Sequence, residues 1–160
     1  MQPAYVKKYF LTALNASPEV LEAFLKAVPA DDPRWDARPD PERFTLREIV
    51  AHLADWDPIF LGRMERTVQE ELPFIPDMDE GQLALDHDYA HLDPHAALAR
   101  FRTRRAGLVV FLSGLADSDW NRVGMKEIHG PVTLERQAVM VLAHDGYHME
   151  QVVQWLEPVK

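Results

Sequence analysis

Apolar residues recur at steps of three and four along most of this chain, and this helical period restricts its fold more than any other feature. The periodic stretches are separated by breaks that contain prolines, and none of them alternates between apolar and polar residues as a strand does. We therefore expect an all-α fold: a four-helix bundle of antiparallel type without strands, formed by a single domain that spans residues 1–160.

The first helical region is expected to be broken in its middle. Residues 4–15 form one arm with an apolar stripe. Ser17, Pro18 and Glu19 then have the order of an N-cap, a first-turn proline and a first-turn acid, which is typical of a helix start. A second arm is therefore expected to begin there and to end before Pro29.

The second helix is expected to begin at a capping box. Thr45 and Glu48 have the spacing at which each side chain can bind the backbone N–H of the other. Pro58 lies within the apolar period that follows, and a proline there leaves the carbonyl of Ala54 without its helical partner. We therefore expect this helix to be kinked at the proline.

Two further helices complete the bundle, beginning at Asp93-Pro94 and near Thr133. The connection between the second and third helices is about 20 residues or longer, so these two helices need not lie close together. The apolar seam of the third helix leaves Arg104 or Arg105 facing inward. Such an arginine can bind a carboxylate of a ligand, but we favour a side chain that extends to the surface or pairs with an acid on the next helix.

The charge and the cysteine content exclude several classes of function. Seventeen lysines and arginines against 26 acidic residues give a net charge of -9, which disfavours nucleic acids and anionic membranes as partners. The absence of cysteine excludes a disulfide scaffold, thiolate metal ligands and a cysteine nucleophile. Because no apolar run approaches the length of a membrane span, we expect a cytoplasmic protein.

Three histidines form a candidate metal site. His144 and His148 are four residues apart in the last helix, so both rings lie on one face within reach of a single ion. Spacing alone allows two interpretations, a metal site or a pair of hydrogen-bonded core histidines. His52, on the inner face of the second helix, favours the metal, because three imidazoles that leave one position open are typical of a catalytic ion.

The other four histidines are weaker candidates. His87, His91 and His95 share the same spacing, but Pro94 interrupts any helix before the third ring aligns, and we interpret all three as surface residues. His129 lies in the loop before the last helix, where it either borders the metal pocket or is simply exposed.

Three segments resemble the DinB-like (YfiT-like) metalloenzyme family, in order and with suitable spacing. Residues 45–57 (TLREIVAHLADWD) are similar to the second helix of that family, and residues 144–152 (HDGYHMEQV) to its fourth helix. Residues 130–134 (GPVTL) match the usual approach to the fourth helix. The resemblance implies a four-helix bundle, usually a homodimer, that binds a divalent metal ion such as zinc or nickel.

The same resemblance implies metal ligands and an activity. Carried over by motif, the ligands are His52, His144 and His148. Independently of the resemblance, Asp55 and Asp145 are candidates to orient the ligating rings, because metal-bound imidazoles usually donate their other N–H to a nearby acceptor. Characterised relatives include S-transferases and isomerases that use a low-molecular-weight thiol such as bacillithiol, mycothiol or glutathione. We therefore favour a thiol-dependent S-transferase acting on a small-molecule substrate. A hydrolase with a metal-activated water and a non-catalytic, metal-binding, dimerising bundle remain open alternatives.

Overall fold

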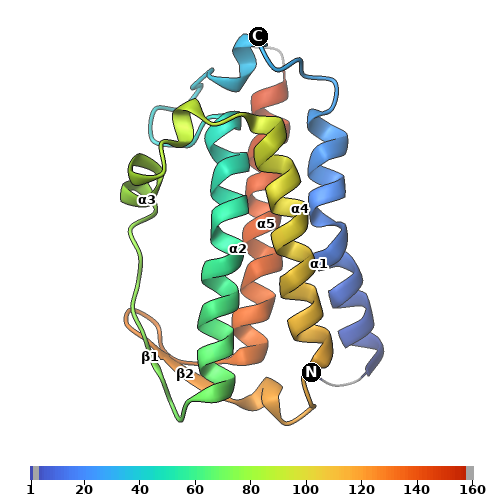
Figure 1. Ribbon diagram of the computed structural model, residues 1–160, viewed down its shortest axis with the longest axis vertical. Helices are drawn as coiled ribbons and strands as arrows, with labels where there is room; N and C mark the ends of the chain where they lie inside the picture. The colour runs from blue at the N-terminus through green and yellow to red at the C-terminus, as the bar shows by residue number, and fades with distance from the viewer. Residues whose placement is uncertain (2–3, 158–160) are drawn as a thin grey trace.

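Four long helices dominate the computed structural model, which describes residue 1 and residues 4–157 (Figure 1). They are α1 (Ala4–Leu25), α2 (Leu46–Gln69), α4 (Pro94–Gly114) and α5 (Leu134–Leu156). The connections contain the short helix α3 (Glu80–Asp86) and the 3-10 turns η1 (Pro33–Trp35), η2 (Tyr89–His91) and η3 (Asp119–Asn121). The expected four-helix bundle is confirmed. None of the helices in the described part of the chain is long and apolar enough to cross a membrane.

The order of the helices in space differs from a simple antiparallel bundle. α1 and α5 run in one direction, and α2 and α4 run in the other (Figure 1). α2 and α4 nevertheless form the most extensive helix pair, while α1 packs on α4 and α5, and α5 packs on α2. Residues 70–93 carry the chain back along the outside of α2 to the start of α4 (Figure 1). The expected antiparallel arrangement is therefore wrong for this pair, because the long connection lets two parallel helices lie side by side.

A small three-stranded sheet closes one end of the bundle, contrary to the expectation of no strands (Figure 1). Its strands are β1 (Phe74–Ile75), β2 (Val123–Lys126) and β3 (Gly130–Thr133). β2 is central, parallel to β1 and antiparallel to β3. Strands of two to four residues are too short for an alternating pattern to reveal. Gly124 fits closely here: a Cβ at this position would lie 2.6 Å from Ile75 Cδ1, so the Ile75 side chain would have to shift.

α1 is continuous through Pro18, so the expected break in the first helix is wrong. The proline removes the hydrogen bond that the carbonyl of Leu14 would otherwise receive. Arg105 replaces that bond, since its Nη1 donates to the Leu14 oxygen at 3.1 Å. The helix also ends at Leu25, before the expected limit at Pro29.

α2 begins at the expected capping box and continues through Pro58. Thr45 accepts from the backbone of Glu48, and the Glu48 side chain accepts from the backbone of Thr45. The carbonyl of Ala54, which the proline deprives of its helical donor, receives a bond from Arg104 Nη1 at 2.9 Å. Arg104 and Arg105, which are adjacent on α4, therefore donate hydrogen bonds to the two carbonyls that Pro58 and Pro18 leave without a helical donor.

The core is divided into two apolar clusters with a polar layer between them. One cluster includes Leu21, Ile49 and Phe101, and the other includes Leu14, Met64 and Leu112. On each of the four long helices, buried polar side chains lie at or near the boundary between these clusters. They are Ser17, His52, Asp55, Asp57, Arg105, Asp145, His148 and Gln151. A buried polar layer needs internal partners for its charges and donors, which makes it the natural place to look for function.

Candidate metal centre

Three histidines from two helices converge in the polar layer. α2 supplies His52, and α5 supplies His144 and His148, whose four-residue spacing stacks them one turn apart. The Nε2 atoms of His52 and His144 are 2.9 Å apart. One ligand atom from each ring lies within 4.8 Å of the other two. The structure therefore brings together the three histidines that the sequence selected as metal ligands.

Burial keeps all three rings in the form that a metal requires. Desolvation lowers the pKa of His52 to about 2, that of His144 to about 4 and that of His148 to about 3. Each ring is therefore neutral near pH 7 and has one nitrogen lone pair available. A cationic ring could not ligate a metal, so the apolar surroundings favour metal binding.

Some buried nitrogens of this cluster have no hydrogen-bond partner in the described part of the chain. The Nδ1 atoms of His52 and His144 are buried and have no hydrogen-bond partner among the described residues. Two facing neutral Nε2 atoms can share one hydrogen, which satisfies one donor and one acceptor at most. A divalent ion among the rings would take their lone pairs, and imidazole nitrogen suits zinc and nickel. The residues present therefore fit such an ion.

A cavity of about 300 Å³ gives access to the rings. Its lining residues are Glu42, Arg43, Phe44, Glu80, Gly81, His144, Tyr147, His148 and Gln151. A space of this volume is at the lower end of the range for small-molecule sites. The arrangement places at least two of the three rings at the wall of a pocket large enough for a small ligand.

The segment that precedes α2 is fastened to α5 beside the rings. The carbonyl of Phe44 accepts from Gln151 Nε2 and from Trp155 Nε1, each at 2.9 Å. Gln151 Oε1 also lies 3.2 Å from Nδ1 of His148. Gln151 thus joins one ring to the wall of the cavity and favours the tautomer with its hydrogen on Nδ1. Gln151 was not predicted from the sequence as a site residue, although its position three residues after His148 places it on the same helix face.

Glu80, at the start of α3, is the carboxylate nearest to the rings. Its Oε2 lies 4.0 Å from Nε2 of His52. Burial, followed by the nearby charges of Asp79 and Asp77, raises the pKa of Glu80. Glu80 was not predicted from the sequence either. Nothing in the sequence around it indicates that residues 70–93 bring it close to the histidines.

Asp145, expected beside the ligating rings, instead pairs with an arginine. Arg105 is fully buried and uses all three guanidinium nitrogens. Nη2 donates to Asp57 Oδ1 at 2.8 Å and to Asp145 Oδ1 at 2.9 Å, Nε donates to Asp57 Oδ2 at 3.0 Å, and Nη1 donates to Asp145 and to Leu14. Burial nevertheless raises the pKa of Asp57 to about 6. The arginine thus links α4, α2, α5 and α1 inside the bundle.

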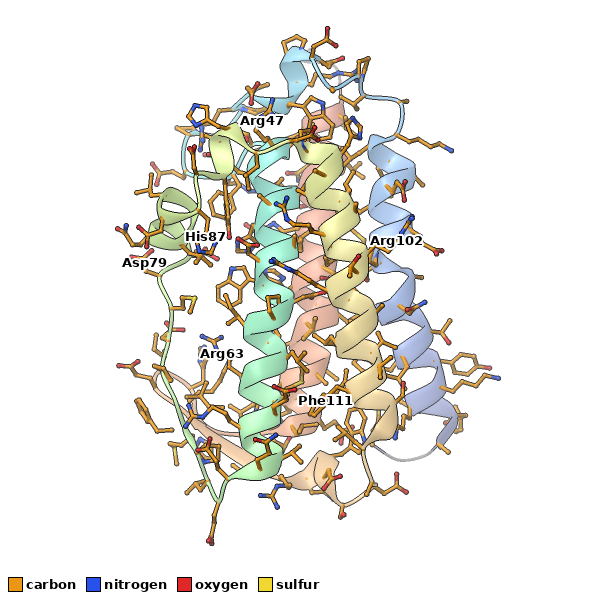
Figure 2. The ribbon with its side chains drawn as sticks, viewed as in Figure 1. Arg47, Arg63, Asp79, His87, Arg102 and Phe111 are labelled. Carbon is orange, nitrogen blue, oxygen red and sulfur yellow. The ribbon has the colours of Figure 1, made fainter. Side chains whose placement is uncertain are left out.

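Asp55 also binds groups other than the metal-site histidines. It accepts from Arg104 Nη1, and its Oδ2 lies 2.6 Å from Nδ1 of His87. Figure 2 shows His87 between α3 and α2, so this pair ties the long connection to the bundle. Arg105 is buried and Arg104 is partly exposed, and both pair with acids on neighbouring helices, the outcome favoured from the sequence. Neither lines the cavity.

The remaining histidines lie away from the cluster. His87, His91 and His95 are exposed, as expected. His91 pairs with Asp88, and His95 packs edge-on against Trp35 with ring centroids 5.6 Å apart. His129 is exposed in the turn between β2 and β3 and does not line the cavity.

Comparisons with known proteins agree with this fold. The model of the DinB superfamily matches residues 13–152. The structure of YfiT from Bacillus subtilis is similar over 97% of this chain and 88% of that chain, with a TM-score of 0.88 and 22% sequence identity. YfiT is described as a "probable metal-dependent hydrolase with an unusual four-helix bundle topology", and at this identity the likeness shows a common fold. No curated protein sequence matches the chain.

Proposed function

This chain belongs to the DinB superfamily, and from that premise we propose that it is an enzyme dependent on a divalent metal ion held by His52, His144 and His148. One observation carries the proposal: three neutral imidazoles from two helices converge, and two of them, His144 and His148, line a cavity. Within residues 1 and 4–157, no other group of three histidine, aspartate or glutamate side chains comes as close together. Zinc and nickel are the proposed ions, because both accept imidazole ligands.

The proposed reaction is the transfer of a low-molecular-weight thiol to a small electrophile. Three histidines occupy three positions of a four-coordinate ion and leave one for a ligand. When bound, the ion supplies a Lewis acid that deprotonates a coordinated thiol. The chain has no cysteine, so the thiol must come from a second molecule that enters the cavity. The protein's own contribution is to keep the rings neutral and to hold them in place.

Hydrolysis is the second candidate, because the similar structure of YfiT carries that description. An ion with one open position can also lower the pKa of a water molecule towards about 7. The two reactions need the same three histidines and differ in what occupies the open position. They are therefore distinguished by chemistry rather than by the ligand set.

We further propose that the protein acts as a homodimer in the cytoplasm. Neighbouring helices α1 and α5 expose large apolar side chains, and twofold dimers are the commonest closed assemblies. These exposed side chains are Tyr5, Val6, Tyr9, Val20, Phe24, Val139, Met140, Tyr147 and Val153. A cytoplasmic location suits a thiol-dependent reaction, because the cytosol keeps small thiols reduced. A dimer mass in light scattering is the expected result, and a monomer at micromolar concentration would contradict it.

Cobalt substitution tests the reaction. A small thiol is expected to produce a sulfur-to-cobalt charge-transfer band and to be conjugated to a model electrophile. His52→Ala is expected to lose both signals, whereas the matched His91→Ala variant, altered at an exposed histidine, is expected to keep them. Ester or amide cleavage without added thiol would instead support the hydrolase. The absence of all three signals in metal-loaded protein would overturn the enzymatic proposal and leave a structural metal.

A further inference from the structure

Arg43 lines the cavity together with His144, His148 and Tyr147. Its guanidinium group lies over the rings of Tyr147 and Trp155, at 5.4 Å and 5.0 Å from their centroids. Its Nη1 donates to Gln154 Oε1 at 2.9 Å. Stacking against two rings and one hydrogen bond fix its position, so the cation is organised before any ligand arrives.

Most of the hydrogen-bonding capacity of this cation is unused. Its ion-pair partner is Glu150, whose Oε2 lies 3.9 Å from Nη2, beyond hydrogen-bond distance, and whose side chain is 60% exposed. Nε of Arg43 is buried and has no partner among the described residues. Arg105, by contrast, donates from all three nitrogens to carboxylate oxygens or a carbonyl. Arg43 therefore retains the capacity to bind an anionic group of a ligand.

Acidic side chains, opposite in charge to Arg43, also line this cavity. Glu80 lies 4.0 Å from the His52 ring, and its side chain is 63% exposed. Within the described residues, no lysine or arginine forms an ion pair with it. Glu42 adds a second acid to the lining. A ligand that carries only a carboxylate is attracted by Arg43 but repelled by these acids. A ligand that also carries an ammonium group is attracted by Arg43 and by the acids.

We propose that the cavity selects a zwitterionic thiol whose carboxylate binds Arg43 and whose ammonium group faces Glu80, with its sulfur at the histidine cluster. The inference rests on the proposed thiol reaction, because the sulfur needs the ion's open position. An α-amino acid with a side-chain thiol, or a small molecule built on one, carries the three groups a few bonds apart. Such a molecule suits a cavity of about 300 Å³.

Four thiols that share an ethanethiol skeleton separate the contributions of the two charges. L-cysteine carries both groups, 3-mercaptopropionate only the carboxylate, cysteamine only the ammonium, and ethanethiol neither. Each is titrated into the cobalt-loaded protein, and its dissociation constant is taken from the charge-transfer band. Variant and parent are compared for the same thiol, so that differences in thiol acidity cancel. The cobalt content is measured after each titration, so that removal of the ion is distinguished from binding.

Arg43→Gln is expected to weaken L-cysteine and 3-mercaptopropionate about tenfold, the effect of one charge-assisted hydrogen bond. It should leave cysteamine and ethanethiol unchanged, which also shows that the variant is folded. Glu80→Gln should weaken L-cysteine and cysteamine by a similar factor. Arg34→Gln, which removes an exposed arginine that does not line the cavity, is the matched control and should change none of them.

Equal effects of Arg43→Gln on all four thiols, or no effect on any, would overturn the assignment of Arg43. A lower affinity of Glu80→Gln for cobalt itself would make Glu80 a metal ligand and overturn its pairing with an ammonium group. If no thiol produces the band in the parent protein, the proposed thiol reaction fails. If the thiols produce the band but do not differ in affinity, the proposed thiol reaction stands and only the selection of a zwitterionic thiol is overturned.

Discussion

Two adjacent polar clusters each take side chains from α2 and α5, and they differ in how many of their buried polar atoms have hydrogen-bond partners. The histidine centre is His52, His144 and His148, and the arginine brace is Arg105 with Asp57 and Asp145. In the brace all three guanidinium nitrogens have acceptors. In the histidine centre two buried Nδ1 atoms have no partner among the described residues.

This difference separates a structural cluster from a ligand site on the same pair of helices. A buried charge group is stable only when its partners are present, so the saturated brace fixes α2 against α5. That constraint holds His52 close to His144, which adjoins Asp145 in the sequence. The buried ring nitrogens of the histidine centre that lack partners then remain available to a ligand that the chain itself does not supply.

Arg105→Met should produce the largest loss of stability. It leaves Asp57 and Asp145 buried without their counter-charge and removes the donor to the Leu14 carbonyl. We expect the free energy of unfolding to fall by about 3–5 kcal/mol, as for other broken buried ion pairs. Urea denaturation measures this change.

Arg102→Met is the matched control for this substitution. Arg102 lies on the same helix, but its pair with Glu22 is exposed, so its loss should cost less than about 1 kcal/mol. Adding Asp57→Asn and Asp145→Asn to Arg105→Met should restore part of the stability, because fewer buried charges remain unpaired. Equal losses for Arg105→Met and Arg102→Met would show that the brace is not structural.

Acid should destabilise the metal-free protein through the histidine centre. Burial lowers the three pKa values to between about 2 and 4, so these rings take up protons near pH 6 only in the unfolded chain. Unfolding then binds protons, and stability falls by about 1 kcal/mol per ring between pH 7 and 5.5. Asp57, whose pKa is raised to about 6, acts in the opposite direction by less than about 1 kcal/mol.

Urea unfolding in the presence of a chelator, at pH 7 and at pH 5.5, measures this dependence. Replacing all three histidines of the centre with glutamine should remove most of it. A metal-free parent with equal stability at both pH values, or a triple variant with the parent's full dependence, would show that these rings are not held neutral by the fold.

The bond from Arg104 to the Ala54 carbonyl should have the smallest effect. We expect Arg104→Met to cost about 1 kcal/mol, because one hydrogen bond and one partly exposed ion pair are lost. The loss should be smaller when Pro58 is replaced by alanine, since residue 58 then supplies a backbone donor to that carbonyl. A double-mutant cycle measures the coupling, and strictly additive effects would contradict the proposed role of Arg104.

The sequence predicted the features that depend on local patterns. The capping box at Thr45, the apolar period of α2 and the four-residue spacing of His144 and His148 are each contained within one helix. The alignment of His52 with that pair followed because its helix could be assigned an inner face. Local periodicity thus predicted both the bundle and the three histidines that meet in it.

Features that depend on distant contacts were not predictable in the same way. Continuity of α1 through Pro18 requires an arginine 91 residues distant to supply a donor. Strand β1 forms by pairing with β2, about 50 residues away in the sequence. Glu80 reaches the site because the long connection folds back along α2 (Figure 1). None of these features produces a periodic or compositional pattern in the sequence.

The metal content of the purified protein tests the histidine centre most directly. After dialysis against zinc or nickel and removal of free ion, plasma mass spectrometry should give close to one ion per chain. The triple variant His52→Gln, His144→Gln, His148→Gln should retain none, whereas His87→Gln, altered outside the centre, should bind like the parent. Full occupancy in the triple variant, or none in the parent, would contradict the assignment of the site.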